Sequence, residues 1–115
     1  MTLKENMTAI KLPGIIQNYI EASNEHDVKS ILACFSDDAV VQDEQEELRG
    51  QKNIKGWLAK TIEKYKFHFK PISARENDGK VVVAVEVSGT FDGSPVTLDY
   101  HVTIKDGLIS ALTIE

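Results

Sequence analysis

Asp43 carries the group in this sequence best placed to move a proton. It follows the β-branched segment Ala39-Val40-Val41, which predicts that it lies at the end of a short strand over 39–43. Side chains alternate along a strand, so Asp43 shares a face with Val41 and points inward if Val41 does. A partly desolvated carboxylate has a raised pKa and can accept a proton near neutral pH. The alternative is a strand-end acid that is hydrogen-bonded to a turn.

Two phenols, Tyr19 and Tyr100, are the candidate partners of this carboxylate. A phenol hydroxyl is a good hydrogen-bond donor to a developing oxyanion. A tyrosine is equally often a core residue whose ring is buried while its hydroxyl group remains in contact with water. If the two phenols share a cavity with Asp43, the three side chains supply a base and two donors. Proton transfer beside a carbonyl needs no more than that, so no cofactor is expected.

The register of one late strand decides which side chain faces the interior there. The stretch Val96–Lys105 alternates apolar and polar residues at every position. Tyr100 falls on the apolar face, whereas Asp99 falls on the opposite face with His101. Counting back from the turn Asp106-Gly107 gives the same register. The sequence therefore predicts that Tyr100 faces the interior and Asp99 does not.

The elements that must position these groups change in character along the chain. Apolar residues at helical spacing predict helices over about 13–25, 28–35 and 51–65, with Asp27 as the N-cap of the second. After residue 65 the period changes from 3.6 to 2. Strands are expected over 39–43, 67–70, 81–87, 96–105 and 108–114. Helices that precede an antiparallel sheet are typical of the α+β class.

Composition limits the class of protein. A chain of 115 residues is expected to form one domain over 1–115, with 1–11 as a poorly ordered or short helical extension. The net charge of −5 argues against nucleic acid or an anionic membrane surface as a partner. The six acids and no base of Asp37–Glu47 are interpreted as a solvated loop, Asp43 excepted.

Cofactor and compartment are judged from what the sequence contains. No HxxxH, HxH or HExxH pattern and no GxGxxG or P-loop occurs, so neither a metal nor a nucleotide cofactor is expected. The one cysteine, Cys34, cannot form an internal disulfide and is interpreted as a small buried hydrophobe. No signal peptide or membrane-spanning run is recognisable, and a cytoplasmic location is therefore expected.

Three stretches that together span about 13–115 carry a resemblance to a known superfamily: IIQNYIEASNEHDVKSILACFSDDAVVQDE, RGQKNIKGWL and VSGTFDGSPVTLDYHVTIKDGLISALTI. They are similar to the nuclear transport factor 2-like superfamily, which includes the SnoaL-like polyketide cyclases and the ketosteroid isomerases. The resemblance implies a cystatin-like cone, in which three N-terminal helices pack against a strongly curved, mostly antiparallel sheet. It also implies a pocket at the wide end, and it leaves the chemistry open because this fold hosts many activities.

The resemblance extends to three positions. In the isomerases of the superfamily a tyrosine lies on the first helix, and Tyr19 matches it. The general base of the isomerases ends the first strand, and Asp43 matches that place. Their second oxyanion donor is an acid that precedes a histidine on a late strand, and here Tyr100 precedes His101. This departure from the isomerase pattern argues against steroid isomerisation.

The outer face of the sheet is the expected interface of a homodimer, the assembly common in the superfamily. The side chains of Thr97, Asp99, His101 and Thr103 on that face are polar but short. Nearby apolar side chains enlarge a patch that is rarely left in water.

Further residues are expected to line the pocket: Ile16, Val41, Trp57, Tyr65, Leu98 and Val102. Core packing is the alternative for Trp57 and Tyr65. Two functions remain. One is a cofactor-free isomerase, cyclase or lyase that acts on an apolar carbonyl compound, and the other is a non-catalytic domain for ligand binding or dimerisation. A cavity of about 300 Å³ or more, lined by Asp43 and a phenol, would distinguish a ligand pocket from a filled, structural cone.

Overall fold

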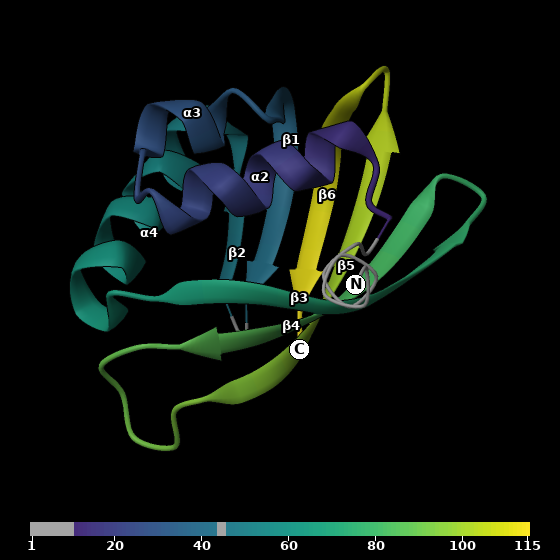
Figure 1. Cartoon of the computed structure of the whole chain (residues 1–115). Coiled ribbons are helices and arrows are strands. Elements are labelled where there is room, and N and C mark those ends of the chain that lie inside the picture. The colour runs from purple at the N-terminus through teal and green to yellow at the C-terminus, as the bar shows by residue number, and fades with distance from the viewer. Residues whose placement is uncertain (1–10, 44–45) are drawn as a thin grey trace.

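The computed structural model describes residues 11–43 and 46–115 (Figure 1). The expected extension over 1–11 thus lies outside the described residues, apart from Lys11. The helices are α2 (Gly14–Asn24), α3 (Val28–Leu32) and α4 (Gly50–Tyr65). The strands are β1 (Phe35–Asp43), β2 (Glu46–Arg49), β3 (His68–Asn77), β4 (Lys80–Ser88), β5 (Val96–Lys105) and β6 (Leu108–Ile114).

The strands form one sheet in the order β2-β1-β6-β5-β4-β3. Every neighbouring pair is antiparallel except β1 and β6, which run parallel. The predicted α+β class and cystatin-like architecture are confirmed. Among the described residues, no helix has both the length and the apolar character to cross a membrane.

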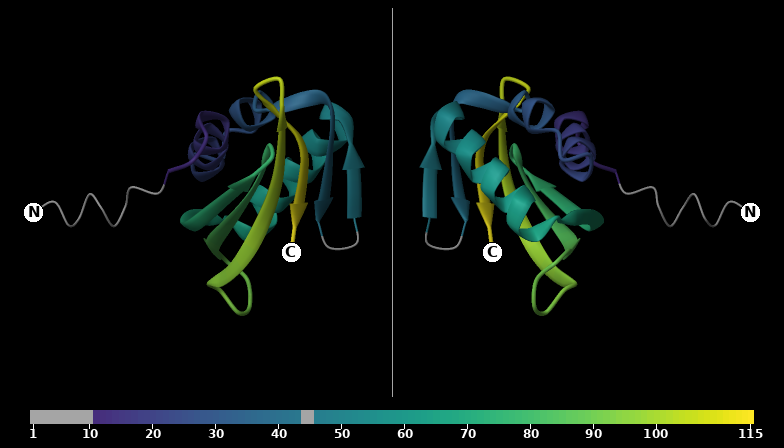
Figure 2. Two further views of the ribbon diagram at one scale, coloured as in Figure 1. Left: turned by 90° about the vertical axis from the view of Figure 1, so that its right-hand side faces the viewer. Right: turned by 90° about the vertical axis from the view of Figure 1, so that its left-hand side faces the viewer.

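The sheet bends strongly around α4. Figure 2 shows β1 and β2 on one side and β3 and β4 on the other, with α4 between them. Pairing shifts register between Phe35 and Val40, between Pro71 and Ser73, and between Thr103 and Ile104. Such irregularities bend a strand and increase its twist, so they allow the sheet to wrap around a helix.

The core fills the space between the helices and the concave face. Helix α4 buries Ile54, Trp57 and Leu58, whose spacing places them on one side of the helix. Strand β4 buries every second residue from Val81 to Val87, and β5 follows the predicted alternation through its middle, whereas Val96 at its start is exposed. Tyr100 is buried and Asp99 is exposed, as that alternation requires.

Helix α3 ends earlier than its apolar stripe suggests. The sequence predicts helix through Phe35, but α3 ends at Leu32 and Phe35 begins β1. Phe35 pairs with Ile109 of β6, and its ring packs edge-to-face on Tyr19 with centroids 5.8 Å apart. These long-range contacts outweigh the local helical spacing.

The acidic segment contains a strand that the sequence analysis interprets as loop. Glu46 and Glu47 belong to β2, which pairs antiparallel with β1. Leu48 lies opposite Val41 and is buried, whereas both glutamates are exposed. One buried leucine among charged residues is too short a pattern to indicate a strand.

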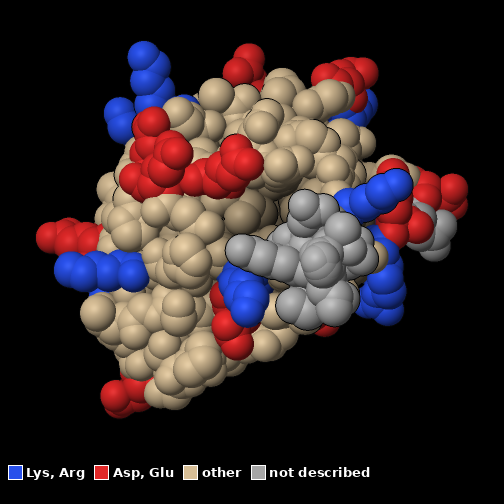
Figure 3. Space-filling model, in the orientation of Figure 1, with Lys and Arg blue, Asp and Glu red and all other residues tan. Residues whose placement is uncertain are grey.

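Charge is spread unevenly over the surface. On the face shown in Figure 3, acidic side chains gather at the upper left and much of the surface is uncharged. The basic side chains visible there are scattered, with one near the middle of the view, and form no continuous stripe. A continuous basic stripe is the usual footprint of a nucleic-acid-binding domain.

The loop between β4 and β5 is held against the end of α4. The Thr90 backbone N–H donates to the Tyr65 carbonyl oxygen at 2.8 Å, and the Thr90 hydroxyl donates to it at 3.1 Å. The backbones approach so closely that a Cβ on Gly89 would collide with this oxygen. Only glycine permits this docking without movement of the chain.

We predict that Gly89→Ala lowers the free energy of unfolding by about 1–3 kcal/mol, because the methyl group must displace a backbone carbonyl. Gly56→Ala is the matched control, since a Cβ at Gly56 meets nothing within 4 Å on the exposed side of α4. It should raise stability by about 0.5–1 kcal/mol. Urea unfolding followed by circular dichroism measures both, and equal effects would contradict the close approach at Gly89.

Candidate active site

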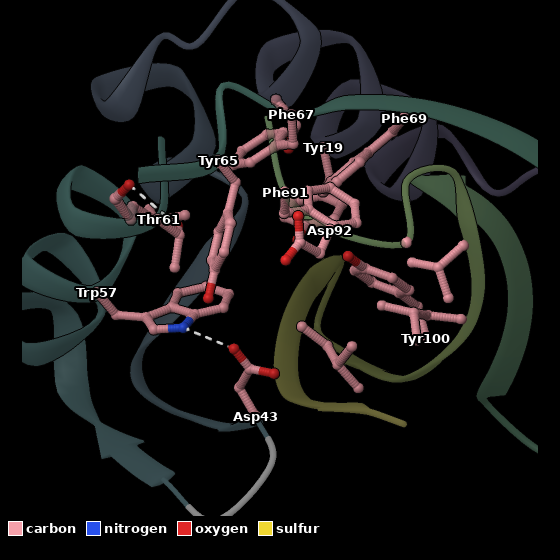
Figure 4. Close-up of a pocket in the computed structure, with 16 residues that line it drawn as sticks. Tyr19, Asp43, Trp57, Thr61, Tyr65, Phe67, Phe69, Phe91, Asp92 and Tyr100 are labelled. Carbon is pink, nitrogen blue, oxygen red and sulfur yellow. Dashed lines mark hydrogen bonds between the residues drawn. The ribbon is translucent and has the colours of Figure 1, made fainter. Parts of the chain in front are cut away.

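A cavity of about 400 Å³ opens at the wide end of the cone (Figure 4). Its walls come from α2, α4, the start of β3 with the residue before it, the β4–β5 loop, β5 and the ends of β1 and β6. Tyr19, Asp43 and Tyr100 all line it. The three side chains that the sequence singles out for proton chemistry are thus brought around one space.

Asp43 lies where β1 ends and is half-buried. Its same-face neighbour Val41 is fully buried, so the strand phase directs the carboxylate inward. The Trp57 indole N–H donates to Asp43 Oδ2 at 3.0 Å, the contact dashed in Figure 4. A hydrogen bond to the ionised carboxylate stabilises its charged form and fixes its orientation.

The phenols of Tyr19 and Tyr100 lie beside each other, with ring centroids 6.5 Å apart. Burial is the main cause that raises the pKa of Tyr19, and a hydrogen bond with Ser23 opposes it. Burial likewise raises the pKa of Tyr100 well above its usual value, and the nearby Tyr19 and Asp43 add to the shift. Both hydroxyls therefore remain protonated at physiological pH and can act as hydrogen-bond donors.

The aromatic wall next to the phenols is tied to α2. Phe67 and Phe69 are stacked with centroids 4.6 Å apart, and Phe69 contacts Tyr100 at 5.5 Å. The Asn24 amide donates to the Phe69 carbonyl at 2.9 Å and accepts from the Phe69 N–H at 2.7 Å. Strand β3 is an edge strand, so Asn24 stands in for a missing neighbouring strand there.

The six residues expected to line the pocket divide into two groups. Trp57, Tyr65 and Leu98 line the cavity. Ile16, Val41 and Val102 do not, because they lie deeper in the core with 1%, 0% and 2% of their surface exposed. Val41 and Val102 are each one same-face step further from the wide end than Asp43 and Tyr100. Ile16 lies about one helical turn before Tyr19.

Several lining residues were missed by the sequence analysis. Phe91, Asp92 and Gly93 come from the β4–β5 loop, which the sequence marks only as a turn. Phe91 is an aromatic residue in a turn, and its ring packs edge-to-face on Tyr65 at 5.8 Å. Ser23 is one helical turn after Tyr19, a spacing that would have placed it on the same face.

Neither a metal site nor a reactive thiol is found in the described part of the chain. Residues 11–43 and 46–115 contain no group of three or more His, Cys, Asp or Glu side chains that could hold a metal ion. Cys34 is buried, and burial raises the pKa of its thiol. A raised pKa disfavours the thiolate that nucleophilic chemistry requires.

We predict that stability falls as pH rises above about 10, the pKa of an unfolded tyrosine. The folded state raises the pKa of Tyr19 and Tyr100, so it retains their protons where the unfolded chain releases them. The two tyrosines make their full contribution to the free energy of unfolding below pH 10. This contribution is lost as the pH rises toward their pKa values in the folded protein. Unfolding measured from pH 8 to 11 should show a shallower fall for Tyr19→Phe and Tyr100→Phe than for the unmodified protein. If the free energy of unfolding falls with pH as steeply in both variants as in the unmodified protein, Tyr19 and Tyr100 do not cause the loss of stability.

Comparisons with known proteins identify the family. The SnoaL-like domain family matches residues 16–112. A proposed polyketide cyclase from Sinorhizobium meliloti has a similar structure, with a TM-score of 0.88 and 36% identity over 90% of this chain and 95% of that chain.

Two further solved structures share the fold. A hypothetical protein with a ketosteroid isomerase-like fold from Catenulispora acidiphila, solved in complex with trimethylamine, has a TM-score of 0.80 and 17% identity over 91% of this chain and 86% of that chain. An NTF2-like protein of unknown function from Cytophaga hutchinsonii has a TM-score of 0.76 and 15% identity over 94% and 91% of the two chains. A comparison with curated proteins found no match. On the strength of the family match across most of its length, the chain belongs to the SnoaL-like domain family.

Proposed function

We propose that this protein is a cofactor-free enzyme that moves a proton beside the carbonyl group of an apolar small molecule. The observation that carries the proposal is the cavity of about 400 Å³ in which Asp43, Tyr19 and Tyr100 meet. Its volume exceeds the roughly 300 Å³ expected of a ligand pocket and argues against a filled, purely structural cone.

In the proposed reaction Asp43 is the general base. Its carboxylate takes a proton from the carbon next to the carbonyl, and the electron pair moves onto the carbonyl oxygen to give an enolate. Tyr19 and Tyr100 act as neutral donors to this oxygen, where negative charge develops. Donors that are fixed in place before the reaction need no reorganisation when the charge appears.

The enolate has two fates that fit the family. It can be reprotonated at another carbon, which is isomerisation, or it can attack a second carbonyl of the same molecule, which is cyclisation. The similarity to the proposed cyclase from Sinorhizobium meliloti supports the second fate. Both fates begin with the same proton abstraction, so the test below addresses the shared step.

We predict that the protein accelerates exchange of the acidic C–H protons of 2-tetralone, an apolar enolisable ketone, in D₂O. Asp43→Asn should reduce this acceleration about 100-fold or more, because shape survives and the base is lost. NMR measures the exchange rate. Asp38→Asn is the matched control, since it removes an exposed carboxylate from the same strand, and its rate should stay unchanged.

Binding of the same ketone separates the enzyme from a non-catalytic domain. The chain has one tryptophan, Trp57, and it lines the cavity, so its fluorescence reports occupancy. Asp43→Asn should retain affinity for 2-tetralone within a few fold. Binding without accelerated exchange in the unmodified protein would refute the enzymatic proposal and favour a ligand-binding domain.

We also propose that two copies pair through the outer face of the sheet. Val82, Ala84 and Thr103 on that face are half-buried rather than fully covered in the single chain. His101 lies 2.7 Å from Glu115, so these two side chains already contact each other within one chain. Light scattering at micromolar concentration should give twice the 12.8 kDa of one chain. A mass of a single chain would contradict this pairing.

A further inference from the structure

The charged groups that line the cavity have one sign. Asp43 at the end of β1 and Asp92 in the β4–β5 loop both line it. Among the described residues, no Lys, Arg or His contributes to the lining. The whole chain also carries a net charge of −5. The cavity thus carries negative charge among largely apolar walls, an arrangement that attracts cations.

Aromatic rings make up much of the remaining wall: Tyr19, Trp57, Tyr65, Phe67, Phe69, Phe91 and Tyr100. The face of an aromatic ring is electron-rich and attracts an ammonium group within about 6 Å of the ring centre. One such contact already exists, since Lys64 Nζ lies 5.2 Å from the centroid of Tyr65. Rings with carboxylates among them are the chemistry that recognises substituted ammonium ions.

We propose that the ligand of this cavity is an apolar molecule that carries a cationic tertiary or quaternary amine. A neutral apolar ligand would gain nothing from the negative charge of the two carboxylates. An anionic ligand would meet two carboxylates and the electron-rich faces of the rings. A cation is attracted by the combined negative charge of Asp43 and Asp92 and gains contacts with the rings.

Asp92 is the specificity-determining residue in this proposal. It lies in the loop that Gly89 and Thr90 hold against α4, and this loop also brings Phe91 to the cavity. Figure 4 shows the Asp92 carboxylate near the middle of that view, between the rings of Tyr65 and Tyr100 and above Asp43. Because Asp92 is exposed, water and salt screen its charge, so its effect on affinity is moderate and depends on ionic strength.

The inference refines the proposed function, since it names the ligand class of the same cavity. The probes are benzyltrimethylammonium, its neutral carbon isostere neopentylbenzene, and the anion benzylsulfonate. Binding to the full chain is followed by Trp57 fluorescence at low salt. We expect benzyltrimethylammonium to bind at least tenfold more tightly than neopentylbenzene, and benzylsulfonate to bind most weakly. Equal affinity for the cation and its isostere would overturn the proposal.

A pair of variants tests the part played by Asp92. Asp92→Asn should weaken binding of benzyltrimethylammonium about two- to fivefold and leave neopentylbenzene unchanged. Asp99→Asn is the matched control, because Asp99 is exposed on the other face of β5 and does not line the cavity. The difference between the two variants should shrink at high salt. Equal effects of the two variants would overturn the assignment to Asp92.

The results also distinguish this inference from the proposed function. Exchange of 2-tetralone protons without a preference for the cation would refute the ligand class and leave the chemistry intact. A preference for the cation without any exchange would refute the chemistry and leave the ligand class intact.

Discussion

The cavity depends on how the sheet bends around α4. The sheet meets the helix through the core side chains Ile54, Trp57 and Leu58, and Trp57 and Leu58 also line the cavity at the wide end. There the β4–β5 loop returns to the last turn of α4, where Thr90 is bonded to the Tyr65 carbonyl. Without this contact the loop residues would lose their support beside the cavity. A backbone contact between two distant segments thus fixes one wall of the site.

Asp43 sets the electrostatics inside these walls. Its carboxylate accepts a hydrogen bond from Trp57, and its negative charge helps to keep the phenols of Tyr19 and Tyr100 protonated. The negative charge of Asp43 therefore favours the neutral form of both phenols, in which they can act as donors. A charged base beside neutral donors is the arrangement required for moving a proton to a carboxylate while an oxyanion forms nearby.

The sequence predicted the orientation of side chains correctly wherever the alternation of apolar and polar residues extended over enough positions. The alternation of β5 over ten residues distinguishes Tyr100 from Asp99, because a shift by one residue would expose the whole apolar face. The phase of β1 orients Asp43 in the same way. Depth was harder to predict: Val41 and Val102 have the correct face, but they lie one step too far from the wide end to meet the cavity.

In short or irregular segments the sequence pattern was too short to predict the secondary structure or the residues that reach the cavity. Strand β2 has a single buried residue, Leu48, and its existence depends on pairing with β1. Phe35 continues a helical stripe in sequence, yet its packing on Tyr19 and its pairing with β6 place it in a strand. Asp92 reaches the site because its loop docks on α4, and no local pattern encodes that contact. These features follow from tertiary contacts between segments far apart in the chain.

The two proposals together constrain the shape of the ligand. A cation close to a carboxylate lowers its affinity for a proton, so an ammonium group next to Asp43 would weaken the base on which the chemistry depends. The ammonium group should therefore lie toward Asp92, while the carbonyl oxygen lies between Tyr19 and Tyr100. The apolar body of the ligand would pack against Phe67 and Phe69, which also line the cavity. A ligand held in this way leaves the Asp43 carboxylate able to accept the proton.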